Sequence, residues 1–158
     1  MKPTLDDVMD TYSSCSDYID HMDTFYRGNF VRFKESYDLN MEIIEKLKGL
    51  VDEYVFVVMF ADWCGDARRT VPVLALLEDE LNIQVRALGG MTKPMGRSDK
   101  NWEVPPSPAE VDTFEVTSSP TIIIFDKKTR EEIGRMKTRP KMTPTVEEEI
   151  LKIIENAR

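Results

Sequence analysis

The sequence predicts a single α/β domain, a four-stranded mixed β-sheet with helices on both faces. A continuous run of β-branched and aromatic residues, Tyr54–Ala61, is typical of a central strand buried on both faces. An amphipathic helix, Ala67–Leu81, then leads to a second apolar strand, Ile83–Leu88, which predicts a right-handed parallel βαβ unit. Two further strands, Thr121–Asp126 and Glu131–Lys137, flank the polar residues KKTR and predict an antiparallel hairpin.

The first third of the chain is predicted to be helical. One helix is expected to begin after Thr4 as N-cap and to end at the segment RGN, residues 27–29. A second helix is expected over Leu39–Lys48, with Asp38 as N-cap and Gly49 as a left-handed stop. Apolar residues at three- and four-residue steps support the first helix: Leu5, Val8, Met9, Tyr12, Cys15, Ile19, Met22, Phe25 and Tyr26. We therefore expect a helical extension over residues 1–50, packed on the α/β domain of residues 51–158.

Capping signals place the remaining helices. Ser107–Glu110 (SPAE) has a Ser, Pro and Glu arrangement that predicts a capping box and a short helix to about Glu115. Thr145–Glu148 (TVEE) predicts a second capping box, which opens the last helix. Between the second strand and the short helix, Gly89–Pro106 is expected to be an irregular loop, because its glycines lack the spacing of a phosphate-binding loop.

Composition excludes several classes of function. The chain has 158 residues, the length of one domain, and a net charge of −8, which argues against nucleic-acid binding. No apolar run approaches the roughly 20 residues that span a bilayer, and the acidic N-terminus lacks a secretory signal, so a cytoplasmic location is expected and no membrane is predicted. Two cysteines and one histidine are too few for a closed zinc site, so no metal and no cofactor is predicted.

Cys64 is the first candidate for chemistry. It falls where a predicted strand ends and a helix begins, a position where backbone N–H groups and the helix dipole stabilise a thiolate. Arg68, one turn further on, adds positive potential, whereas the carboxylate of Asp66 opposes it if it points at the sulfur. The alternative is that Cys64 is a small buried apolar residue, which is common for free cysteines.

Proline 120 marks a second candidate segment. The sequence SSPT, Ser118–Thr121, places a proline directly before an apolar strand, where it is tolerated only at the first position. The Ser119–Pro120 bond is therefore a candidate for the cis form, although this signal is weak by itself because few X-Pro bonds are cis.

Taken together, these segments resemble the thioredoxin superfamily. The matching features are FADWCGDA, the proline eight residues after the cysteine, SSPTIIIF and Gly134 within the hairpin, over Val51–Arg158. The match is closest to a subgroup with WCGDA or WCGDS, an N-terminal helical extension and an Arg-Pro pair, here Arg139–Pro140. The resemblance implies a cis bond at Ser119–Pro120 beside Cys64. It also implies that Cys64 is the catalytic nucleophile and that the surrounding residues contact the substrate: Trp63, Gly65, Asp66, Ser119 and Pro120.

The sequence also departs from thioredoxin at two positions. Ala67 stands where thioredoxin has its resolving cysteine, and Val58 stands where it has a buried acid that activates that cysteine. The absence of an acid at position 58 is consistent with the absence of a cysteine at position 67, because a buried carboxylate with no thiol to activate only adds a desolvation cost. Cys15 lies on the apolar stripe and is expected to be buried, although a bridge to Cys64 is open if that helix packs over the site.

The sequence thus predicts a thioredoxin-like protein with a single active-site cysteine. Cys64 is expected to form mixed disulfides with a protein or a low-molecular-weight thiol, released by an external thiol. The alternative is a redox-inactive module that binds a protein or peptide in a groove beside Pro120, lined by Trp63 and the loop of residues 89–106. An iron–sulfur protein with glutathione as co-ligand has no supporting pattern.

Overall fold

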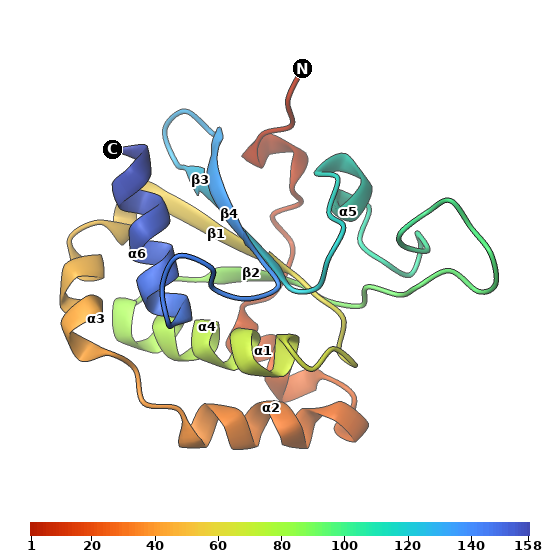
Figure 1. Ribbon diagram of the computed structural model, residues 1–158, viewed down its shortest axis with the longest axis horizontal. Coiled ribbons are helices and arrows are strands. Elements are labelled where there is room, and N and C mark those ends of the chain that lie inside the picture. Colours follow the sequence, from red (N-terminus) through yellow and green to blue (C-terminus); the bar gives the residue numbers. More distant parts are fainter.

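The central element is a four-stranded mixed sheet in the order β2-β1-β3-β4, described by a computed structural model of residues 1–158 (Figure 1). β1 is parallel to β2 and antiparallel to β3, and β3 pairs antiparallel with β4. The predicted mixed sheet is confirmed, with β2 and β4 starting slightly later than expected. The strands are β1 (Tyr54–Met59), β2 (Val85–Leu88), β3 (Thr121–Asp126) and β4 (Glu132–Lys137).

β1 lies between two hydrophobic cores, which explains its unbroken apolar sequence. Phe56 and Val58 enter the core on the face covered by α4, whereas Val57 and Met59 enter the core on the opposite face. All four side chains are at most 2% exposed. A strand that must fill two cores has no position left for a polar residue.

Helices cover both faces of this sheet. The helices are α1 (Cys15–His21), α2 (Thr24–Ser36), α3 (Met41–Lys48), α4 (Ala67–Leu81), α5 (Glu110–Thr113) and α6 (Val146–Ala157), with short 3-10 turns at Leu5–Asp7 and Val51–Glu53. α4 has the predicted bounds, and α2 lies along its outer side, away from the sheet (Figure 1). None of the helices combines the length and the apolar character that a bilayer crossing requires.

The single helix predicted for the N-terminal third is wrong. Thr4 caps only a 3-10 turn, and two separate helices follow, α1 capped by Ser14 and α2 capped by Asp23. Residues 27–29 lie inside α2 and do not end it. The backbone before α1 pairs with the sheet instead of forming a helix, because Ala87 N donates to Ser13 O at 2.9 Å. The extension therefore covers the free edge of β2.

Two predicted helix starts were also misplaced. α3 begins after Asn40, whose side chain accepts from Ile43 N, and Gly49 has φ −83°, which is not left-handed. The capping box at Ser107–Glu110 does not form, because both side chains are engaged in tertiary contacts. Ser107 Oγ accepts from Thr92 N at 2.8 Å, and Glu110 accepts from the Tyr12 hydroxyl at 2.8 Å. Thr145 caps α6 as predicted, since its side chain accepts from Glu148 N. The predicted capping box is incomplete, because the Glu148 carboxylate accepts from the Thr145 hydroxyl and not from its backbone N–H.

Buried carboxylates hold the extension on the α/β domain. Glu78 of α4 accepts from the backbone N–H of Cys15 and Ser16. Glu147 of α6, which is fully buried, accepts from the hydroxyl of Tyr37 and from Asn40 N. Each of these acids satisfies donors on the extension that would otherwise be buried without a partner.

Candidate functional site

Cys64 lies in the turn that joins β1 to α4. Its backbone N–H donates to Ala61 O at 3.2 Å, and its carbonyl accepts from Arg68 N at 3.3 Å, so the turn leads directly into the first turn of α4. The Cys64 side chain is half-buried, whereas the neighbouring Trp63 is 41% exposed. The thiol is therefore at the strand-to-helix junction that the sequence predicts, within reach of solvent.

The Ser119–Pro120 segment lies directly against this thiol. The peptide bond between the two residues is cis. Cys64 Sγ is 3.3 Å from Ser119 O and donates its S–H to it. Ser119 Oγ in turn accepts from Ala61 N at 2.9 Å, so both polar groups of Ser119 hold the Cys64 turn against the start of β3. Pro120 itself is buried.

Trp63 forms the exposed rim of the site. Lys93 Nζ lies 5.4 Å from the centroid of the Trp63 ring, a cation–π contact. Lys93 belongs to the loop of residues 89–106, so this loop reaches the Trp63 side of the site.

Neither the Asp66 side chain nor the Arg68 side chain has a hydrogen bond or ion pair to Cys64. Asp66 makes no side-chain cap and pairs instead with Arg69 at 3.4 Å and Arg139 at 3.6 Å. Arg68 is half-buried, and no hydrogen bond or ion pair joins its side chain to Cys64. Stabilisation of a thiolate by Arg68 stays a prediction.

Sequence reasoning missed a hydrogen-bonded pair beside the site, Tyr18 and Asp62. The Tyr18 hydroxyl donates to Asp62 Oδ1 at 2.6 Å, which ties α1 to the residue two positions before Cys64. Burial raises the pKa of Asp62, the hydrogen bond from Tyr18 opposes this, and the charge of Asp23 adds to the rise. Tyr18 also fills the space beside Gly89, where a Cβ would lie 2.0 Å from its hydroxyl oxygen. The one sequence signal for this contact was Gly89, a glycine directly after the second strand.

Cys15 is separate from this chemistry. Its side chain is fully buried in the core on the α4 face, and both cysteines are free thiols. Burial, and secondarily the charge of Glu78, raise the pKa of the Cys15 thiol well above its ordinary value. No group of three or more His, Cys, Asp or Glu side chains is arranged to hold a metal ion.

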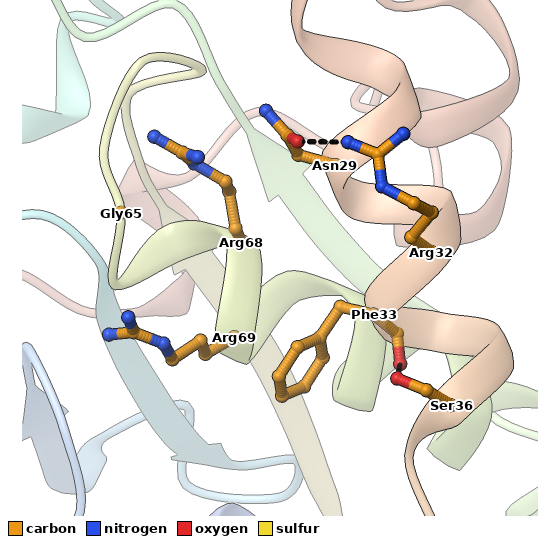
Figure 2. Close-up of a pocket in the computed structure, with 7 residues that line it drawn as sticks. All are labelled: Asn29, Arg32, Phe33, Ser36, Gly65, Arg68 and Arg69. Carbon is orange, nitrogen blue, oxygen red and sulfur yellow. Dashed lines mark hydrogen bonds between the residues drawn. The ribbon is translucent and has the colours of Figure 1, made fainter.

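Two cavities adjoin the start of α4, and the sequence predicted neither. The first, of about 390 Å³, lies between α2 and α4 and is lined by Asn29, Arg32, Phe33, Ser36, Gly65, Arg68 and Arg69 (Figure 2). The second, of about 350 Å³, shares Phe33 and Arg69 with the first and extends toward Arg139. Neither is lined by Trp63 or Pro120, so the groove expected beside Pro120 is not one of them.

Comparisons with known proteins agree with this architecture. The chain is similar over its whole length to a protein of unknown function from Pseudomonas aeruginosa, with a TM-score of 0.72, 19% identity and 99% of both chains covered. It is also similar to an HIV epitope scaffold, with a TM-score of 0.62, 16% identity, and 94% of this chain and 86% of that chain covered. No curated protein matches. A family described as Thioredoxin matches residues 12–151, and the chain therefore belongs to the thioredoxin family.

Proposed function

We propose that the protein performs thiol–disulfide exchange through Cys64, forming a mixed disulfide with a protein or a low-molecular-weight thiol. One observation carries the proposal: a partly exposed thiol at the start of a 15-residue helix lies 3.3 Å from the Ser119 carbonyl. Helix starts favour thiolates, and the thiolate is the nucleophile in disulfide exchange. Membership of the thioredoxin family supports this chemistry.

The exchange proceeds in two displacements. Cys64 loses its proton to solvent, and its thiolate attacks one sulfur of a disulfide R–S–S–R′. A bond forms between Cys64 Sγ and R–S, the old S–S bond breaks, and R′–S⁻ leaves with the bonding electron pair. Loss of the S–H also frees the Ser119 carbonyl to accept an N–H from the bound partner.

The second displacement needs a thiol from outside the chain. Ala67 offers no resolving sulfur, and Cys15 is fully buried. An external thiolate R″–S⁻ therefore attacks the R sulfur, forms R–S–S–R″ and releases the Cys64 thiolate. We place this reaction in the cytoplasm, where thiols that resolve such adducts are abundant.

The test is adduct formation with a small disulfide. After incubation with oxidised glutathione, the intact protein should gain the mass of one glutathionyl group and lose it again when excess reduced thiol is added. Cys15→Ala should behave like the unchanged protein, and Cys64→Ala should gain nothing. An adduct on Cys15, or none on Cys64 in native conditions, would exclude this function.

A redox-inactive binding module is the second candidate. The exposed Trp63 ring with Lys93 above it favours this candidate, because such a surface suits a polar peptide whether or not the thiol reacts. The rate of Cys64 alkylation across pH separates the two. A rate that is already high at neutral pH supports exchange, whereas a rate that follows that of a free model thiol supports the module.

A further inference from the structure

The cavity between α2 and α4 is unusually basic for this chain. We call it the arginine pocket and define it by Asn29, Arg32, Phe33, Gly65, Arg68 and Arg69, with Ser36 at its edge. The whole chain has 29 acidic and 21 basic residues, yet three arginines and no carboxylate line this cavity. Its volume of about 390 Å³ lies within the range of pockets that hold small molecules.

The three guanidinium groups are poorly neutralised within the protein. Arg68 forms no ion pair, and Arg32 donates to the neutral amide oxygen of Asn29. Arg69 has one carboxylate partner, Asp66, at 3.4 Å, and Asp66 is shared with Arg139 at 3.6 Å. Like charges that line one cavity repel each other, and an anion bound there relieves that repulsion.

The side chains come from two helices that face each other. Figure 2 shows Arg68 of α4 and the pair Asn29–Arg32 of α2 on opposite sides of the gap, whereas Arg69 extends away from α2. A guanidinium fork matches the oxygens of a carboxylate or phosphate group, and the amide of Asn29 has N–H donors of the same kind. The N–H donors of Arg68, Asn29 and Arg32 therefore line a cavity that can hold an oxyanion.

The pocket lies next to the thiol. Gly65 lines its rim and follows Cys64 directly, with about 3.8 Å between consecutive Cα atoms. A ligand that places an acidic group among the arginines can thus bring its other end to Cys64. The helix α2 belongs to the N-terminal extension, so the extension supplies half of the pocket.

We propose that the arginine pocket binds the carboxylate or phosphate groups of a small anionic thiol, and that this thiol is the partner of Cys64. The proposal rests on the proposed function for the identity of the sulfur partner, but the anion site itself does not depend on it. Of the two kinds of partner in the proposed function, a protein or a low-molecular-weight thiol, this proposal selects a low-molecular-weight thiol that is acidic. An acidic group held in the pocket raises the local concentration of the sulfur at Cys64.

The binding test uses the full-length Cys64→Ser protein, so that no disulfide can form. Calorimetry should detect binding of reduced glutathione, which carries carboxylates, or of coenzyme A, which carries phosphates. The ligand that binds more tightly identifies the oxyanion that the pocket prefers. Glutathione diethyl ester, whose carboxylates are blocked, should bind at least about tenfold more weakly than glutathione if carboxylates are recognised. Arg32→Gln and Arg68→Gln should each weaken the binding of the tighter ligand about tenfold, and added salt should also weaken it about tenfold.

Arg158→Gln is the matched control. Arg158 pairs with Glu53 beside the start of β1, the opposite end of the strand from Cys64, and its loss should leave binding unchanged. Equal effects of Arg158→Gln and Arg68→Gln would overturn the proposal, as would absence of binding by both thiols. Inorganic phosphate that binds as tightly as either thiol would also overturn it, because the site would then recognise no more than a free anion.

A kinetic arm separates this inference from the proposed function. In the protein with Cys64 intact, Arg32→Gln should lower about tenfold the ratio of the rate of adduct formation with the disulfide of the tighter thiol to the rate with neutral hydroxyethyl disulfide. If both disulfides fail to react while the acidic thiol still binds, the exchange function is wrong and the pocket stands. If this ratio is the same in Arg32→Gln and in the unchanged protein, the pocket assignment is wrong and exchange stands.

Discussion

The hydroxyl of Tyr18 donates a 2.6 Å hydrogen bond to the carboxylate of Asp62, two residues before Cys64. This contact joins the N-terminal extension to the turn that carries Cys64. Tyr18 also packs edge-on against Phe60, with ring centroids 4.9 Å apart. The extension therefore helps to shape the site from one side through Tyr18, and from another through the α2 wall of the arginine pocket.

Asp62→Asn should stabilise the protein at neutral pH and not at pH 4. Burial raises the pKa of Asp62 above its ordinary value of 3.8, so the native state binds the proton more tightly than the unfolded chain does. The contribution of Asp62 to stability is therefore fully present below about pH 4 and is lost as the pH rises through the pKa of Asp62 in the folded state. Asparagine has no such loss and keeps an oxygen for the Tyr18 hydroxyl.

Urea denaturation at pH 4 and pH 7 measures this difference. The expected gain at pH 7 is at most about 1 kcal/mol, because Asp62 remains partly in contact with water. Tyr18→Phe removes the one contact that lowers the pKa of Asp62, so it should increase the loss of stability between the two pH values. The same stability difference between Asp62→Asn and the unchanged protein at both pH values would contradict this account.

Cys64 should be the only thiol that is alkylated in the native protein. Cys15 is fully buried, so neither solvent nor reagent reaches it, and burial raises the pKa of its thiol, which disfavours the reactive thiolate. Mass spectrometry after treatment with iodoacetamide should find one label, on Cys64, and a second on Cys15 only in denaturant. Native labelling of Cys15 would show that α1 opens readily.

Glu78→Ala should destabilise the protein by about 3 kcal/mol. The Glu78 carboxylate accepts from Cys15 N, Ser16 N and Val85 N, so its loss leaves donors at the start of α1 and of β2 without partners. Hydrogen exchange at these three amides should accelerate together. Glu80→Ala is the matched control, since Glu80 is an exposed residue of the same helix, and it should change stability by less than about 0.5 kcal/mol.

Ala67→Cys should create a disulfide with Cys64 without creating an efficient reductase. The change restores a Cys-x-x-Cys spacing at the start of α4, where two sulfurs can come within bonding distance. Position 67 is fully buried, however, and the apolar Val58 supplies no base to deprotonate the new thiol. Reduction of insulin disulfides should therefore be slow, with resolution of the mixed disulfide limiting.

Val58→Asp added to Ala67→Cys should speed that resolution and cost about 3 kcal/mol of stability, because it buries a carboxylate. Insulin reduction and urea denaturation of the single and double variants measure both effects. Equal reduction rates in the two variants would refute the role assigned to position 58. Failure of Ala67→Cys to close its disulfide would contradict the geometry of the Cys64 turn.

The sequence by itself determined the sheet, α4 and the place of Cys64. These elements depend on local patterns that tertiary contacts reinforce: the run Tyr54–Ala61 fills two cores, and the helix Ala67–Leu81 keeps its apolar stripe despite Pro72. Gly134 was noticed only through the resemblance, and the structure supplies its reason. A Cβ there would lie 2.6 Å from a methyl group of Ile153, so β4 and α6 could not pack as they do.

Only the tertiary structure decided the N-terminal third and the surroundings of the thiol. Three- and four-residue apolar spacing fits a continuous helix, but it also fits a turn, an extended segment and two short helices that bury the same side chains. The second arrangement forms because Ser13 and Ser14 pair with β2, and because Glu78 and Glu110 bind nearby donors from distant elements. The Tyr18–Asp62 pair and the arginine pocket likewise join residues that no sequence spacing connects, since each depends on where the extension packs and not on any local propensity.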